Sequence, residues 1–269
     1  ESERVMGRIL KKMEWPRDTW IVSSKVFFGA GGKLPTQLGL HRKHVVEACH
    51  DALKRLQADY LDLYFCHRPD PSTPIDETVW SMHSLIMQGK VMYWGTSEWS
   101  VDQIKEAHGV AEKHHLIGPV MEQPQYNLFH REKVEKEFAP LYETVGLGTT
   151  IWSPLASGVL SGKHTLEGDA SSRLRAAGLD WLRERELNAS RLQAVEKLKP
   201  IAAGLGLSLP VLAIAWCLKN PRVSTVILGA SKLAQLDENL KAVEAQDMLT
   251  DESMAQVEKV LEGEKLSTW

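Results

Sequence analysis

The amino-acid sequence predicts an α/β protein in which parallel strands alternate with helices and form a barrel. Short apolar runs recur along the chain, and amphipathic segments of about ten or more residues separate them. This alternation is typical of right-handed βαβ units and a parallel sheet. A doubly wound sheet is the rival architecture. However, the loop at Gly29, Gly31 and Gly32 lacks the G-x-G-x-x-G spacing and does not open a helix directly. The barrel is therefore favoured.

The first half of the chain supplies four of the predicted strands. Apolar residues at helical spacing, from Val5 to Leu10, predict a first helix that ends before Pro16. Strands are then predicted over residues 19–25, 60–66, 91–94 and 119–122. The helices between them are predicted over residues 42–57, 74–88 and 100–113, with Pro74 at a first helical position and Ser100 or Asp102 as a cap.

The second half adds two strands, over residues 148–152 and 223–228. Helices are predicted over residues 131–145, 188–203, 208–219, 233–245 and 251–261. The charged stretch 173–185 is predicted to be mostly a solvated face, with Arg173 as a possible exception. The total is about six strands rather than eight, and no repeat of 20–50 residues indicates a solenoid.

Composition indicates one large globular domain covering residues 1–269, with 43% hydrophobic and 25% charged residues. The net charge of −3 argues against nucleic acid as a partner. Three widely spaced cysteines, Cys49, Cys66 and Cys217, favour a reducing, cytoplasmic compartment. No run approaches the roughly 18 apolar residues of a membrane span, so no direct membrane insertion is expected. The histidines lack metal-ligand spacing, so no metal site is predicted.

Functional candidates follow from the strand ends, because a parallel barrel gathers its chemistry at their carboxyl side. The side chains delivered there are Lys25, His67, Ser97, Gln123, Trp152, Ser153, Gly229 and Ser231. Lys25 would favour the anion of a neighbouring acid, although a lysine extending to solvent is the simpler alternative. His67 could orient a carbonyl or share a proton, and a histidine bonded to backbone is equally plausible.

Two later positions suit a nucleotide. Trp152 could stack on a flat heteroaromatic ring, although filling the core is the default for tryptophan. Gly229 and Ser231 precede a predicted helix, where backbone N–H groups favour a phosphate. Capping of that helix by Ser231 is the simpler, compatible alternative.

Five motifs in order carry a family resemblance. They are Tyr-Phe-Cys-His-Arg-Pro-Asp-Pro (64–71), Tyr-Trp-Gly-Thr-Ser-Glu-Trp-Ser (93–100), Glu-Gln-Pro-Gln-Tyr-Asn (122–127), Trp-Ser-Pro-Leu-Ala-Ser-Gly (152–158) and Leu-Gly-Ala-Ser (228–231). Together they resemble the aldo-keto reductases, nearest to the potassium-channel β-subunit branch. The resemblance implies a (β/α)₈ barrel, an NADP(H) cofactor and reduction of a small aldehyde or ketone.

The resemblance also implies a role for each matching residue. Lys25 and His67 would be catalytic, and the channel β subunits carry asparagine at the position of His67. The nicotinamide would contact Ser97, Gln123 and Trp152. The pyrophosphate segment would contact Ser153, Leu155, Ser157, Gly158 and Lys163. The adenosine and its 2′-phosphate would lie near Arg173, Gly229, Ser231, Gln235, Glu238 and Asn239.

The family's tyrosine acid and an aspartate five residues before it would both precede residue 1, as would the first two barrel strands. None of Tyr60, Tyr64, Tyr93, Tyr126 or Tyr142 matches that tyrosine. We therefore expect an N-terminally incomplete barrel that keeps half of the catalytic tetrad. Two alternatives remain: a cofactor-binding regulatory subunit on a potassium channel with little turnover, and a barrel without either role. The resemblance allows a monomer or a homotetramer, and it leaves the substrate unspecified.

Overall fold

The computed structural model describes residues 1–164, 174, 178 and 180–262, and it confirms an α/β protein with parallel strands. The chain divides into two compact units. Unit 1 consists of Glu1–Gln123 and Pro140–Gly148, and unit 2 of Pro124–Ala139 and Thr149–Trp269. The single barrel domain and the two absent strands stay predictions.

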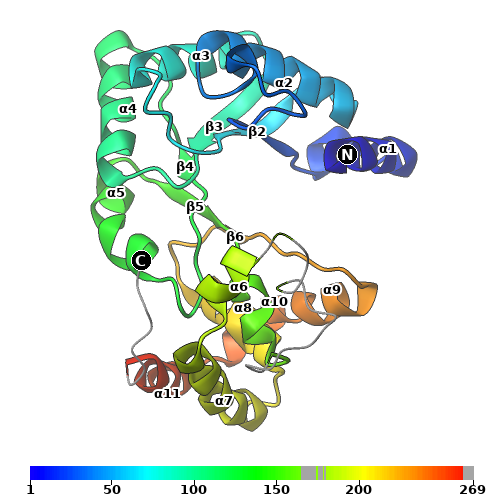
Figure 1. Ribbon diagram of the computed structural model, residues 1–269, viewed down its shortest axis with the longest axis vertical. Coiled ribbons are helices and arrows are strands. Elements are labelled where there is room, and N and C mark those ends of the chain that lie inside the picture. The colour runs from blue at the N-terminus through cyan, green and yellow to red at the C-terminus, as the bar shows by residue number, and fades with distance from the viewer. Residues whose placement is uncertain (165–173, 175–177, 179, 263–269) are drawn as a thin grey trace. The chain divides into compact units, whose positions relative to one another are not determined.

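Unit 1 contains four parallel strands in sequence order (Figure 1). They are β1 (Ser23–Val26), β2 (Leu61–Cys66), β3 (Val91–Thr96) and β4 (Met121–Glu122). In the register Lys25 lies opposite Phe65, and Phe65 lies opposite Gly95. Because the strands are parallel and aligned in this way, their carboxyl ends lie along one edge of the sheet.

The helices of unit 1 fall close to the predicted ranges. They are α1 (Ser2–Met13), α2 (Arg42–Leu56), α3 (Ile75–Met87) and α4 (Val101–His114), with short 3₁₀ turns η1 (Arg17–Thr19) and η2 (Pro35–Gln37). Helix α2 packs on β1 and α3 packs on β3. Ser100, rather than Asp102, caps α4, because its hydroxyl accepts the Gln103 N–H at 3.2 Å. Pro74 is the N-cap of α3 rather than its first residue.

Unit 2 is built around one apolar helix. The strand β5 (Gly148–Ile151), of which all but Gly148 belongs to unit 2, pairs in parallel with β6 (Thr225–Val226), with Thr150 opposite Thr225. Helix α8 (Leu209–Lys219) is buried along most of its length and contacts β6 and several helices. The surrounding helices are α6 (Asp180–Glu186), α7 (Ala189–Gly204), α9 (Leu233–Leu240), α10 (Ala242–Ala245) and α11 (Asp251–Glu262), with 3₁₀ segments η4 (Ala156–Ser161) and η6 (Gln246–Met248).

Five predicted elements differ from the structure. The first strand begins at Ser23 rather than at residue 19, and the strand predicted over 119–122 shortens to Met121–Glu122. The helix predicted over 131–145 begins as a π-helical turn, η3 (Lys133–Glu137), and continues as α5 (Ala139–Thr144). The change occurs where the Phe138 N–H bonds the Lys133 carbonyl, five residues back. The helix predicted over 233–245 is divided between α9 and α10, and the last strand shortens to two residues.

A helix that was not predicted overlaps the stretch 173–185, which is expected to be mostly a solvated face. Among the described residues of that stretch only Leu174 and Leu182 are buried. Residues 180–186 form α6, which also buries Glu186, directly after the stretch. The Glu186 carboxylate forms an ion pair with the Arg191 guanidinium, and both side chains have 0% exposure. Arg185 also binds Glu186, at 2.7 Å. The charge-rich composition concealed this segment because burying an ion pair requires partners that a sequence does not reveal.

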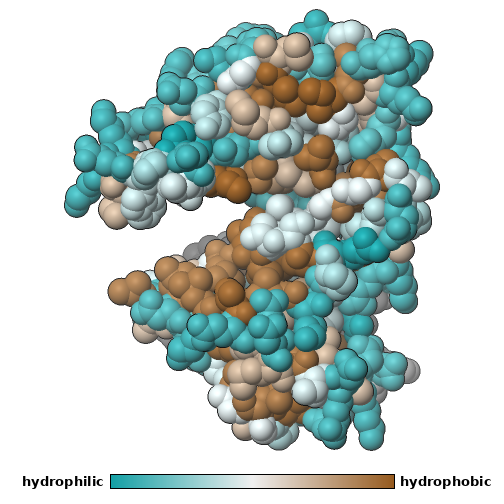
Figure 2. All heavy atoms as spheres, turned by 180° about the vertical axis from the view of Figure 1, so that it is seen from behind, coloured by the Kyte–Doolittle hydropathy of each residue, from teal (hydrophilic) through white to brown (hydrophobic). Residues whose placement is uncertain are grey.

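Two surface properties complete the description. Figure 2 shows hydrophobic residues gathered over the α9 region of unit 2, where Leu233, Leu240 and Val243 are 73%, 51% and 57% exposed. Among the described residues, no helix alone has the length and hydropathy of a membrane span; α7 and α8 pass that test only as a pair bent by 86°.

Candidate functional site

The predicted residues of unit 1 lie at consecutive strand ends. Lys25 is in β1, and His67, Ser97 and Gln123 directly follow β2, β3 and β4. Backbone hydrogen bonds continue the sheet at these positions. The His67 N–H bonds the Val26 carbonyl at 2.9 Å, and the Gln123 N–H bonds the Thr96 carbonyl at 2.8 Å. The strand ends therefore bring these side chains to one edge of unit 1.

Lys25 has no carboxylate partner within ion-pair distance in the described part of the chain. It is exposed at the surface, yet the surrounding protein removes much of the water from its ammonium group. This desolvation, followed by repulsion from the Arg68 guanidinium, lowers the pKa of Lys25 below 10.5. Lys25 thus contributes positive charge that no described acid neutralises.

His67 is neutral at physiological pH. Burial lowers the pKa of His67 from 6.5 to about 4, with further lowering by the charges of Lys25 and Arg68. The exposed ring of Phe28 meets the imidazole edge to face, with the ring centroids 5.3 Å apart. A neutral imidazole beside cations can donate one hydrogen bond to a carbonyl oxygen.

Arg68 connects these strand ends, although it is not among the residues that the sequence predicts for the site. Its Nη1 donates to the His67 carbonyl at 2.6 Å and to the Ser97 hydroxyl at 3.3 Å. The buried Ser97 hydroxyl in turn donates to the Gln123 carbonyl at 2.8 Å. Since that donation uses its one hydrogen, the Ser97 oxygen has only acceptor capacity left.

In unit 2, Trp152 and the loop after it follow β5. The Trp152 N–H bonds the Pro124 carbonyl at 3.0 Å, and its own carbonyl accepts the Tyr126 N–H at 3.2 Å. Within the next residues Ser153, Ala156 and Ser157 have φ values of 59°, 46° and 57°. Left-handed backbone at non-glycine residues is costly, and it is enriched at ligand sites. The segment from Ser153 to Gly158 therefore has a strained backbone of the kind that is enriched at ligand sites.

The loop before α9 departs from the expectation for Ser231. Lys232, not Ser231, occupies the N-cap position. The Gln235 side-chain oxygen accepts three hydrogen bonds, from the Ser231 N–H at 2.9 Å, the Ser231 hydroxyl at 3.1 Å and the Lys232 N–H at 3.1 Å. Three donors thus converge on one oxygen at a helix start, the donor arrangement that a phosphate oxygen requires.

The remaining predicted residues are dispersed over unit 2. Asn239 is buried, Lys163 and Gly229 are exposed, and Leu155 precedes η4. The Lys241 ammonium donates to Glu238 at 2.6 Å and lowers the pKa of the Glu238 carboxyl. Arg173 lies outside the described residues. The described residues include no group of three or more histidine, cysteine or acidic side chains arranged to hold a metal.

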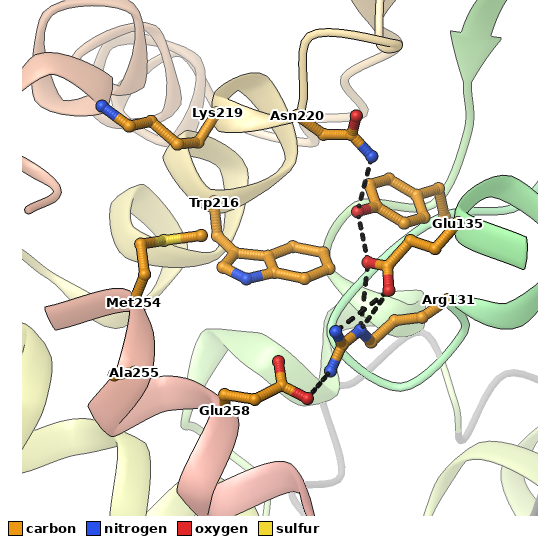
Figure 3. A pocket seen from close by; sticks show the side chains of 9 residues that line it. Arg131, Glu135, Trp216, Lys219, Asn220, Met254, Ala255 and Glu258 are labelled. Carbon is orange, nitrogen blue, oxygen red and sulfur yellow. Dashed lines mark hydrogen bonds and ion pairs between the residues drawn. The ribbon is translucent and has the colours of Figure 1, made fainter. Parts of the chain in front are cut away.

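A pocket of about 370 Å³ in unit 2 contains none of the predicted site residues (Figure 3). Arg131 bonds Glu135 at 3.0 Å and Glu258 at 2.8 Å. The Tyr126 hydroxyl donates to Glu135 at 2.8 Å, and the Asn220 amide donates to that hydroxyl at 3.1 Å. These polar groups satisfy one another, so the pocket wall is a structural network.

Comparison with known proteins identifies the family. The model of the Aldo/keto reductase family matches residues 1–262. An Oryza sativa subsp. japonica protein named "probable voltage-gated potassium channel subunit beta" is 49% identical over 99% of this chain and 81% of its own length. An Arabidopsis thaliana protein of the same name is 48% identical over 97% of this chain and 80% of its own length.

A third relative, a Schizosaccharomyces pombe protein named "putative voltage-gated potassium channel subunit beta", is 46% identical over 97% of this chain and 76% of its own length. The family profile spans both units, and the strand-end residues of unit 1 and the loops of unit 2 lie within it. The expected resemblance is therefore confirmed, and the chain belongs to the aldo/keto reductase family.

Proposed function

We propose that this protein reduces aldehydes or ketones to alcohols with NADPH. The observation that carries the proposal is the edge of unit 1, where Lys25, His67, Ser97 and Gln123 end four neighbouring parallel strands. Such an edge is where barrel enzymes hold their reacting groups. Membership of a reductase family supports the same reaction class.

The residues present fit an NADP(H) cofactor. In unit 1 the Ser97 oxygen can accept an N–H from the nicotinamide carboxamide, since its own hydrogen is bonded to Gln123. In unit 2 the strained loop from Ser153 to Gly158 and the donors around Gln235 suit phosphate oxygens. Gln235 would have to release the Ser231 donors when a phosphate binds there.

The chain's own residues then have separable roles. When bound, the cofactor supplies the hydride. Neutral His67 donates a hydrogen bond to the substrate carbonyl and places it at the strand ends. The positive charge of Lys25 favours negative charge developing on that oxygen, and solvent water supplies the proton that completes the alcohol. The tyrosine that the family uses as acid matches none of the five tyrosines here. The hydroxyls of Tyr64 and Tyr126 are already bonded to the Val45 carbonyl and Glu135.

The proposal is tested first by cofactor binding, because binding does not depend on the proton donor. A concentration of NADPH about 100 times its Kd adds about 2.7 kcal/mol of stability, which appears as a rise in melting temperature. We expect this rise with NADPH and a smaller one with NADH, and we expect Ser97→Ala to reduce it. Absence of any shift with either cofactor would overturn the proposal and favour a barrel without either role.

Turnover is measured separately, as NADPH oxidation with 4-nitrobenzaldehyde. The 269-residue chain should oxidise NADPH slowly, because the expected proton donor is not among its tyrosines. Fast turnover would show that the acid is one of the described residues and that the assigned roles are incomplete.

The relatives' names support a second candidate, a cofactor-binding subunit attached to a voltage-gated potassium channel. In that case NADPH should bind, and the protein should co-purify with a co-expressed channel. His67 is the discriminating residue. If His67→Asn leaves the rate of NADPH oxidation with 4-nitrobenzaldehyde unchanged, the regulatory function is favoured over the enzymatic one.

A further inference from the structure

We infer that Arg68 binds a carboxylate on the carbonyl substrate, so that the preferred substrates are aldehydes or ketones that carry an acidic group. The inference rests on the proposed reductase function and narrows it to a substrate class. It is carried by the hydrogen bonds of Arg68, by its lack of an acidic partner and by its neighbours at the strand ends.

Arg68 differs from the other arginines that are not fully exposed in the described part of the chain. Each of those has a carboxylate within 4 Å, and they are Arg17, Arg55, Arg131, Arg183, Arg185 and Arg191. Arg68 is half-buried and has none among the described residues. A guanidinium is costly to desolvate, so one without an acid is a site for an anion from outside.

The geometry of Arg68 leaves one edge of its guanidinium available. Both hydrogens of Nη1 are used, one by the His67 carbonyl and one by the Ser97 hydroxyl. These bonds hold the group in place at the ends of β2 and β3. Its Nη2 and Nε have no hydrogen-bond partner in the described structure. Both atoms remain accessible to solvent. Two parallel N–H groups on this edge match the two oxygens of a carboxylate.

The surroundings favour an anion with an apolar body. Lys25 and Arg68 repel one another, and no described acid lies close enough to either to pair with it. The exposed ring of Phe28, against His67, offers apolar surface for the remainder of the substrate. An aromatic or aliphatic aldehyde with a carboxylate would satisfy both features.

The test compares two ligands that differ in one charge, 4-carboxybenzaldehyde and its neutral methyl ester, by calorimetric titration in the presence of NADP⁺. We expect the carboxylate to bind about tenfold more tightly or better, as for other charge-assisted hydrogen bonds. Arg68→Gln should abolish this advantage and leave the affinity for the ester within about twofold. Arg68→Lys should retain only part of it, because lysine keeps the charge but loses the paired donors. Arg4→Gln, an exposed arginine of α1, is the matched control.

Several outcomes overturn the inference. Equal affinities for the acid and the ester would do so. A preference for the carboxylate that persists in Arg68→Gln would also do so, because Lys25 would then be the residue that binds it. If inorganic phosphate competed with 4-carboxybenzaldehyde at equal affinity, Arg68 would be a site for any anion, including the phosphates of the cofactor. The NADPH melting shift of wild type and Arg68→Gln is measured in parallel. Loss of the shift in wild type contradicts the reductase proposal, whereas a retained shift without carboxylate preference contradicts only the present inference.

Discussion

Arg68 in unit 1 and Arg131 in unit 2 are both half-buried arginines that end up in opposite situations. Arg131 contacts Glu135, one helical turn ahead, and Glu258 from α11, and these carboxylates raise the pKa of its guanidinium against the effect of burial. Arg68 bonds only a carbonyl and a hydroxyl. The first arginine joins elements of the fold, and the second holds its charge available for a ligand. Residue type and burial alone do not distinguish them; the placement of carboxylates does.

Like Arg131, the fully buried Arg191 is bonded to a carboxylate of the fold. Variants of its ion pair should cause the largest loss of stability. Glu186→Gln would leave the Arg191 charge without a compensating carboxylate, at a cost of about 3–5 kcal/mol of unfolding free energy. Arg191→Met should cost less, because Arg185 continues to bind Glu186. Urea denaturation measures both. If Glu186→Gln changed stability by less than about 1 kcal/mol, burial of this pair would not matter as we argue.

Substitution of Arg131 should cause the second-largest loss of stability. Arg131→Met removes the partner of two carboxylates that are partly exposed, so we expect a loss of about 1–3 kcal/mol. The control is Lys136→Met, since Lys136 and Glu132 form an exposed pair, with side-chain exposures of 75% and 54%. That pair should contribute no more than about 0.5 kcal/mol. Equal effects of the two variants would place Arg131 among the ordinary surface charges.

Much of the fold was predictable because its signals are local. The apolar run of β2 and the cap at Ser100 lie within a few residues of sequence, and both occur where expected. Helix α6 was missed because its stability depends on a pair formed with Arg191 in the next helix. The division between α9 and α10 likewise has no clear marker among the residues involved. Signals that depend on tertiary partners are absent from a periodicity pattern.

The residues of the candidate site divide in the same way, into those predictable from local sequence and those that depend on tertiary partners. The strand ends carrying Lys25 and His67 could be predicted, because any parallel sheet collects its carboxyl ends at one edge. The function of Arg68 could not be predicted, because it depends on the absence of carboxylates around the guanidinium in the folded protein. The resemblance named Gln235 near the adenosine, but the hydrogen bonds that its side-chain oxygen accepts from the Ser231 N–H and hydroxyl could not be predicted from the sequence.

The pH dependence of stability tests whether His67 is kept neutral, by burial first and by the neighbouring charges of Lys25 and Arg68 second. The pKa of His67 is about 4 in the folded protein and near 6.5 when unfolded, so the unfolded chain binds more protons between these values. The contribution of His67 is therefore complete above pH 6.5 and is lost as the pH falls towards 4. Allowing for partial exposure, we expect a loss of about 1–2 kcal/mol.

The measurement subtracts the stability of His67→Asn from that of wild type at pH 7.5 and at pH 4.5. The subtraction removes the titration of other groups, such as His108, whose pKa burial also lowers. A difference that is constant with pH would mean that the imidazole is not held neutral by burial and by Lys25.

Arg68→Gln should produce the smallest change in stability, and it is the sharpest test of the two arginines. Because Arg68 neutralises no carboxylate, its removal leaves no buried acid behind, and the glutamine amide can still donate to the His67 carbonyl. We expect a change of less than about 1 kcal/mol. The pKa of Lys25 should rise, though only part of the way to 10.5, since desolvation is the larger cause of its lowering.

Urea denaturation measures the change in stability, and NMR titration of labelled lysine measures the pKa of Lys25. A loss of stability as large as that of Arg131→Met would show that Arg68 is a structural arginine after all. Its charge would then be committed to the fold and could not be held for a substrate.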